Sequence, residues 1–301
     1  MPDSRKKVYK TMLEKFSFET FRKRNDRQPA ETGRKDIAGL AKQAQEAFAA
    51  NDLAAVLESL NLIREKTLPE SERAPEGMSL LETKELFKND FLGILEIEKF
   101  TGRKFSETEK KKIANMWTEK IKEQNLTRED LECLKKEGFM IVLRTSTLIH
   151  EGRELMATIE NLRKKFKGLF HNLSWYNNEK FATDMQNAVR MSWAIVKKEI
   201  LDESRNKNWD EQEKVLQRWA REHKVDSKFV TRRTPAEAAY DIPAYYHARN
   251  KHILEKDWDW TGVQSSDGYF TLIGKFGSNG LGVSYVVRGY SSSYLGVCPS
   301  R

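Results

Sequence analysis

The sequence predicts an α+β protein, with a helical N-terminal region followed by a domain of helices packed on a small antiparallel sheet. Apolar residues recur at helical spacing through much of the first 136 residues. The run Phe139-Met140-Ile141-Val142-Leu143 then follows a glycine and is typical of a buried strand. The last 44 residues hold eight of the sixteen glycines and alternate between strand-like runs and turns.

The first predicted region, residues 1–78, is helical and basic. Apolar residues at 37, 40, 44 and 48 keep a helical period, and Asp52 can cap a second helix after the break at Asn51. The stretch Pro69 to Gly77 is polar and contains two prolines and a glycine, which is typical of a linker. We therefore place a linker at 69–78 and a domain boundary at its end.

A small helical module is predicted over 79–136. Ser106 and Glu109 form a capping-box pattern before an apolar-periodic run. Thr127 to Asp130 opens a further short helix that Gly138 can end. The remaining residues, 137–301, are expected to form one binding domain.

The first half of that domain is predicted to be helical after its opening strand. Apolar spacing indicates helices over Glu154 to Phe166, Phe181 to Leu201, and Trp209 to Glu222. Tryptophans recur along this stretch at helical spacing, which is more typical of core packing than of a cofactor site. They are Trp175, Trp193, Trp209 and Trp219.

The second half opens with a strong helix signal. Thr234 can cap the helix, with proline at its first position and Glu237 at its third, and the helix should run to about His247 unless Pro243 shortens it. The turn Gly277-Ser278-Asn279-Gly280 lies between two alternating runs and predicts a β-hairpin. A last short strand over Leu295 to Cys298 is expected to close the antiparallel sheet.

Several classes of function find little support in the sequence. No apolar run is long enough to span a membrane, and no apolar segment follows the basic start, so neither a membrane protein nor a secretory signal is expected. The two cysteines, Cys133 and Cys298, are interpreted as buried small hydrophobes, which indicates a reducing cytoplasm. The five histidines show no metal-ligand spacing, and no catalytic constellation is evident. We therefore expect no metal, no cofactor and no enzymatic activity.

A tyrosine- and serine-rich segment near the C-terminus is the strongest candidate for a binding site. Tyr, Ser and Gly with an occasional Arg are favoured in recognition loops, because Tyr supplies rigid contact area while Ser and Gly adapt their hydrogen bonds. The alternative is a terminal loop without a partner. The candidate ligand-binding residues are Tyr269, Ser284, Tyr285, Arg288, Tyr290, Ser291, Ser292, Ser293 and Tyr294.

The order of motifs over residues 232–301 resembles the C-type lectin fold of the formylglycine-generating-enzyme type. The matching pieces are Arg232-Arg233-Thr234-Pro235-Ala236-Glu237, Trp258-Asp259-Trp260-Thr261, Arg288-Gly289-Tyr290 and Leu295 to Arg301. The resemblance implies a lectin-like domain that extends back to Phe139, with a helical insertion over 170–230. The oxidases of that family use a cysteine pair, whereas this domain offers only Cys298, so oxidase activity is not implied.

The same fold is used by the variable proteins of diversity-generating retroelements, and the chain looks like one of them. In those proteins, rewriting of adenine-bearing codons enriches Tyr, Ser, Asn, Asp and Gly at ligand-facing positions. The resemblance implies a ligand-binding protein whose C-terminal surface contacts a protein or other macromolecule.

Nucleic-acid association is the alternative function. The formal net charge is +8, and residues 1–36 hold eleven Lys/Arg against six Asp/Glu. An affinity that falls steeply with salt would support this alternative. The phosphate-contacting residues would be Arg5, Lys6, Lys7, Lys10, Arg22, Lys23 and Arg24. An enzymatic function would require a metal or a reactive thiol.

Overall fold

In a computed structural model, residues 39–46, 55, 59, 78–171 and 174–301 are described. The chain divides into two compact units, Met1–Arg73 and Ala74–Arg301. In the first unit, residues 39–46 are helical. Among the described residues, no helix is both long and apolar enough to cross a membrane.

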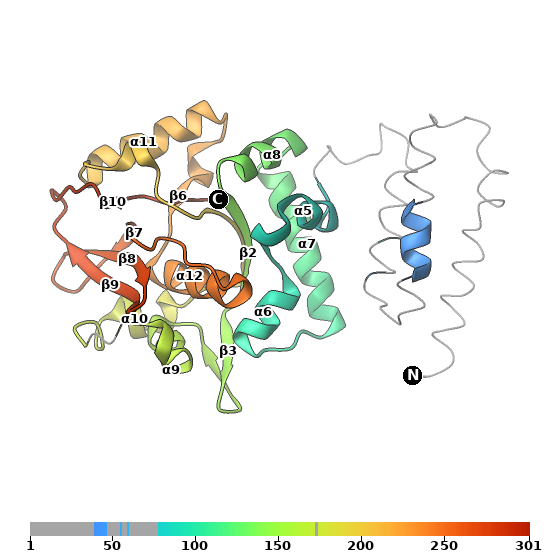
Figure 1. Cartoon of the computed structure of the whole chain (residues 1–301), viewed down its shortest axis with the longest axis horizontal. Coiled ribbons are helices and arrows are strands. Elements are labelled where there is room, and N and C mark those ends of the chain that lie inside the picture. Colours follow the sequence, from blue (N-terminus) through green and yellow to red (C-terminus); the bar gives the residue numbers. More distant parts are fainter. Residues whose placement is uncertain (1–38, 47–54, 56–58, 60–77, 172–173) are drawn as a thin grey trace. The chain divides into compact units, whose positions relative to one another are not determined.

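The second unit is a mixed α/β structure with several small sheets, compatible with the α+β class (Figure 1). Its helices are α5 (Leu80–Phe87), α6 (Ile94–Thr101), α7 (Glu107–Glu123), α8 (Arg128–Lys136), α9 (Ile159–Lys165), α10 (Lys180–Thr183), α11 (Trp209–Glu222) and α12 (Pro235–Arg249), with short 3-10 turns η2 (Lys88–Asp90), η3 (Lys167–Leu169), η4 (Met185–Asn187), η5 (Asp202–Ser204) and η6 (Ser227–Phe229). Its strands are β1 (Phe91–Leu92), β2 (Phe139–Arg144), β3 (Thr147–His150), β4 (Arg153–Met156), β5 (Ser192–Lys197), β6 (Thr231–Arg232), β7 (Trp258–Gln264), β8 (Phe270–Gly277), β9 (Gly280–Val286), β10 (Leu295–Gly296) and β11 (Pro299–Ser300).

Two sheets organise this unit. A five-stranded sheet has the order β1-β2-β5-β11-β6, and a four-stranded sheet has the order β10-β7-β8-β9; β3 and β4 form a separate hairpin. The predicted strand at Phe139 is confirmed as β2, which is buried along its whole length. The helices of 79–136 share one hydrophobic core with residues 137–301, because Phe87, Ile113 and Trp117 pack in the same cluster as β2 and β5.

Helix α12 lies in the middle of the unit and contacts both sheets and the helices α6 and α9 (Figure 1). The predicted capping box is confirmed, since the Thr234 side chain accepts from the Glu237 N–H and the Glu237 side chain accepts from the Thr234 N–H. Most of its residues are buried, which explains its apolar character on nearly every side. Pro243 lies inside the helix, which nevertheless continues to Arg249.

Three predictions of secondary structure are wrong. The predicted helix over Phe181 to Leu201 is replaced by the short α10 and by strand β5, whose apolar run Trp193 to Val196 is central in the five-stranded sheet. A continuous apolar run of this length fits a buried strand as well as a helix, and sheet pairing decides between them. The helix predicted from Glu154 begins only at Ile159, because residues 153–156 pair with β3.

The third error concerns the C-terminal strand. Residues 295–296 form β10, which pairs with β7 in parallel, whereas residues 299–300 form β11 and cross to the five-stranded sheet. The last residues therefore join the two sheets instead of closing one. Two backbone hydrogen bonds between Ile195 and Arg301 hold the last residue against β5.

The predicted hairpin is confirmed as β8 and β9. Gly280 begins β9 with φ +86°, a conformation that side chains other than glycine rarely adopt. A Cβ at this position would lie 2.8 Å from the carbonyl carbon of Phe170. The glycine is therefore required both by the turn and by the close approach of residues 169–171.

Candidate functional site

The nine predicted ligand-binding residues, which we call the tyrosine surface, lie in and around the four-stranded sheet. Tyr269 lies just before β8, Ser284 and Tyr285 lie in β9, and the remaining residues lie in the connection from β9 to β10. The four tyrosine side chains are 37% to 46% exposed, although aromatic residues are usually more buried. Such rings offer apolar area and a hydroxyl to solvent on a hydrogen-bonded scaffold.

One pair of rings lies at the hairpin. The centroids of Tyr269 and Tyr285 are 5.2 Å apart, and Trp175 packs edge-on against Tyr285 at 4.7 Å. The indole N–H of Trp175 donates to the Val283 carbonyl at 3.0 Å, which fixes the tryptophan to β9. Trp175, which is partly buried and packed against the core, thus supports Tyr285.

A second pair lies in the connection between β9 and β10. The hydroxyl oxygens of Tyr290 and Tyr294 are 2.9 Å apart, and the Lys275 ammonium lies 4.5 Å from the Tyr294 ring centroid. This hydrogen bond raises the pKa of Tyr290 and lowers the pKa of Tyr294. Among the described residues, no ring contact or hydrogen bond joins this pair to Tyr269 and Tyr285, so the surface presents two separate tyrosine pairs.

The polar residues of the connection hold its shape as well as facing solvent. The carbonyl of Ser292 accepts from the Asn206 N–H at 2.9 Å, and the carbonyl of Ser293 accepts from Arg205 at 2.7 Å. Ser291 and Ser293 are exposed, while Ser284 and Ser292 are half-buried.

Arg288, one of the predicted ligand-binding residues, forms an exposed ion pair. Its guanidinium binds the Asp210 carboxylate at the start of α11, with Nε 3.1 Å from Oδ2, and this pairing raises the pKa of Arg288. Val287, which was not among the predicted residues, is 54% exposed beside it. In the sequence, Val287 continues the strand-like run of Tyr285 and Val286, so its exposure could not be predicted. In the structure β9 ends at Val286, and Val287 is exposed after it.

A buried ionic network lies in the same unit as the tyrosine surface. Arg233 is fully buried, with its Nη2 atom 2.8 Å from Asp259 in β7 and its Nη1 atom 3.4 Å from Asp241 in α12. Arg144, at the end of β2, donates to both oxygens of Asp241 at 3.0 and 2.6 Å. Burial alone would lower the pKa of both guanidinium groups, but the carboxylates outweigh it and raise the pKa of each. The network joins the two sheets through α12.

The neighbouring Arg232 contacts aromatic residues and a backbone carbonyl. Its guanidinium carbon lies 3.8 Å from the Trp209 ring centroid, and its Nη1 donates to the Trp260 carbonyl at 3.0 Å. Burial lowers its pKa to about 10. Arg232 thereby fastens α11 to the four-stranded sheet, on the side where Arg288 is held by Asp210.

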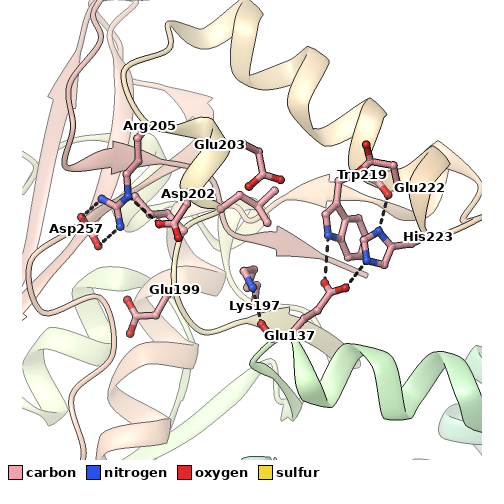
Figure 2. Close-up of a pocket in the computed structure, with 12 residues that line it drawn as sticks. Glu137, Lys197, Glu199, Asp202, Glu203, Arg205, Trp219, Glu222, His223 and Asp257 are labelled. Carbon is pink, nitrogen blue, oxygen red and sulfur yellow. Dashed lines mark hydrogen bonds and ion pairs between the residues drawn. The ribbon is translucent and has the colours of Figure 1, made fainter.

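A polar cleft of about 550 Å³ lies elsewhere in the same unit (Figure 2). Arg205 binds the Asp257 carboxylate at 2.6 and 2.9 Å, and burial raises the pKa of Glu199. Glu137 and His223 point toward each other at one end of the cleft. Six carboxylates line it, namely Glu137, Glu199, Asp202, Glu203, Glu222 and Asp257, against one lysine and one arginine.

Cys133 lies next to Glu137 and is exposed, contrary to the prediction that both cysteines are buried; Cys298 is buried. The ligand atoms of Cys133, Glu137 and His223 all lie within 4.8 Å of one another. We call these three residues the Cys133 cluster. No sequence spacing signals it, because Glu137 and His223 are 86 residues apart.

The predicted phosphate-contacting residues, Arg5 to Lys10 and Arg22 to Arg24, lie outside the described residues. No family model, no curated protein and no solved structure matches this chain. The chemistry of its own residues is therefore the basis on which a function is assigned.

Proposed function

We propose that this chain is a binding protein whose tyrosine surface contacts a protein or another macromolecule. The observation that carries the proposal is the exposure of Tyr269, Tyr285, Tyr290 and Tyr294 on one short stretch of chain. Buried aromatic anchors contribute much of the binding energy at protein interfaces, and tyrosine does so at low entropic cost. Two preformed tyrosine pairs lose little conformational freedom on binding.

We further propose that residues 137–301 form a C-type-lectin-like domain of the kind diversified by retroelements. The proposal is supported by the placement of the matching motifs on successive elements. The Thr234 motif opens α12, the Trp258 motif lies in β7, the Arg288 motif lies after β9, and the final motif contains β10 and β11. The connection between β9 and β10 displays the residue types that such diversification enriches.

Replacement of Tyr285, Tyr290 and Tyr294 by alanine tests the binding function. Proteins retained from an extract of the source organism by the immobilised full chain would be compared between the parent and the variant. We expect the triple variant to lose specific ligands that the parent retains. A matched control is Leu95→Ala with Met185→Ala, which removes two exposed apolar side chains outside the tyrosine surface. Equal retention by the triple variant and the parent would refute the assignment.

Sequencing the 3′ end of the gene across many cells tests the retroelement origin separately. Substitutions confined to codons for about residues 269–294, with a near-copy template and a reverse transcriptase gene nearby, are expected. A uniform 3′ end without a template would leave a fixed binding surface and remove the diversification.

A further inference from the structure

We propose that Cys133, Glu137 and His223 bind a divalent transition-metal ion of the Zn²⁺ type at the end of the acidic cleft. The three side chains offer one sulfur, one oxygen and one nitrogen ligand, which is a donor set that zinc accepts in proteins. A thiolate and an imidazole together disfavour Mg²⁺ and Ca²⁺, which prefer oxygen.

The three ligand atoms are close enough to share a single ion once one short contact opens. Ligand atoms at zinc bond lengths and tetrahedral angles lie about 3.3 to 3.8 Å apart. The Cys133 Sγ atom is 3.6 Å from the Glu137 Oε1 atom, and that oxygen is in direct contact with the His223 Nε2 atom. The contact between Glu137 Oε1 and His223 Nε2 is shorter than coordinated ligand atoms allow, so side-chain rotation must move these two atoms apart to admit an ion, within a cluster whose ligand atoms all lie within 4.8 Å of one another.

The hydrogen bonds of His223 prepare its Nε2 atom for a cation. Its Nδ1 atom lies 2.8 Å from the Trp219 carbonyl oxygen, which can only accept, so Nδ1 carries a proton. In the neutral imidazole the Nε2 atom then presents a lone pair, directed at the Glu137 carboxylate. Two such acceptors can share one metal ion, which would hold the two atoms further apart than they are here. Metal-binding histidines commonly donate their other N–H to a backbone carbonyl in this way.

Trp219 orients the other parts of the cluster as well. Its indole N–H lies 3.3 Å from Glu137 Oε2, which leaves Oε1 directed at His223 and Cys133. Its ring stacks on the His223 ring with centroids 4.0 Å apart. Because Trp219 is itself buried, it holds both ligands from the core side.

The electrostatic setting favours a cation. Glu137 is the C-cap of α8 and His223 is the C-cap of α11, so the negative ends of two helix dipoles meet at the cluster. The adjoining cleft carries six carboxylates, although the chain as a whole is basic. Lys197, which also lines the cleft, donates to the Glu137 backbone carbonyl and not to its carboxylate. The fourth coordination position would be filled by water or by a ligand from the cleft.

The test is metal binding by the full chain after removal of metals with a chelator. Zn²⁺ would be titrated in competition with a chromophoric chelator, and Co²⁺ would be added as a spectroscopic probe. We expect one tight zinc equivalent and a thiolate-to-cobalt charge-transfer band in the near ultraviolet. Cys133→Ser and His223→Gln should each weaken zinc binding by more than about 100-fold, since even residues that only orient metal ligands contribute about 10- to 100-fold.

His150→Gln is the matched control, because His150 also lies beside a glutamate, with 3.7 Å between its Nε2 atom and Glu151, but has no part in the cluster. It should bind zinc as tightly as the parent. Trp219→Phe, which keeps an aromatic ring but removes the indole N–H, should weaken binding to a smaller degree. Thermal unfolding of the metal-free variants verifies that each is folded. The proposal is overturned if the parent takes up no zinc, if Cys133→Ser and His223→Gln bind it as the parent does, or if the cobalt complex lacks the charge-transfer band.

Discussion

The tyrosine surface and the buried ionic network use polar side chains in opposite ways. Tyr285, Tyr290 and Tyr294 expose more than a third of their side chains, whereas Arg233 and Asp259 are fully buried. The exposed rings contact one another and a few neighbours, while each buried charge faces at least one opposite charge. The buried ion pairs join separate elements of the fold, so we expect the displayed tyrosines to tolerate substitution better than the network does.

The largest effect is expected from breaking the buried network. Arg233→Met should lower the free energy of unfolding by about 3 to 5 kcal/mol, because it leaves the carboxylates of Asp241 and Asp259 buried without this partner. Denaturant unfolding measures the change. Arg288→Gln is the control, since its ion pair with Asp210 is exposed, and it should leave the unfolding midpoint unchanged. A midpoint for Arg233→Met equal to that of the parent would break the comparison.

A smaller effect of opposite sign is expected at Lys120 in α7. Burial, followed by the nearby Arg144 and Arg301, lowers the pKa of this ammonium to about 8. The charged form is therefore disfavoured in the folded state, so Lys120 destabilises the protein below pH 8. The unfolding free energy should rise between pH 8 and pH 10.5, where the folded protein releases this proton before the unfolded chain does.

Lys120→Met should accordingly raise the free energy of unfolding by about 1 to 3 kcal/mol at pH 7, after allowance for partial exposure. The gain should shrink as the pH approaches 10.5. Urea titrations of parent and variant at both pH values measure it. A gain that does not depend on pH would mean that packing, and not charge, is responsible.

The smallest effect on stability is expected at the tyrosine surface. The triple alanine variant at Tyr285, Tyr290 and Tyr294 should lower the unfolding midpoint less than Arg233→Met does, because these rings are 38% to 46% exposed, whereas Arg233 is fully buried. Tyr290→Phe with Tyr294→Phe sharpens the comparison, since it keeps the rings and removes the hydrogen bond between the two hydroxyls. A marked loss of stability in either variant would show that the surface is part of the scaffold.

The local signals in the sequence were informative where neighbouring residues decide the structure. The capping boxes at Ser106 and Thr234 and the hairpin turn before Gly280 are interactions within a few residues, and each is present in the structure. Apolar spacing was misleading at Trp193 to Val196, where an apolar run could form a helix or a strand. Pairing with β2, about 50 residues earlier in the chain, decides for the strand.

The sequence by itself determined the composition of the C-terminal segment, its helix start and its hairpin, because caps, turns and side-chain chemistry act over short stretches of chain. Only the tertiary structure decided which tyrosines pair and that Arg288 is held by Asp210. It also decided that Arg233 is buried between two carboxylates and that Cys133 meets His223. Each of these contacts joins residues from different elements, and their meeting depends on how the helices and sheets bury their apolar faces together.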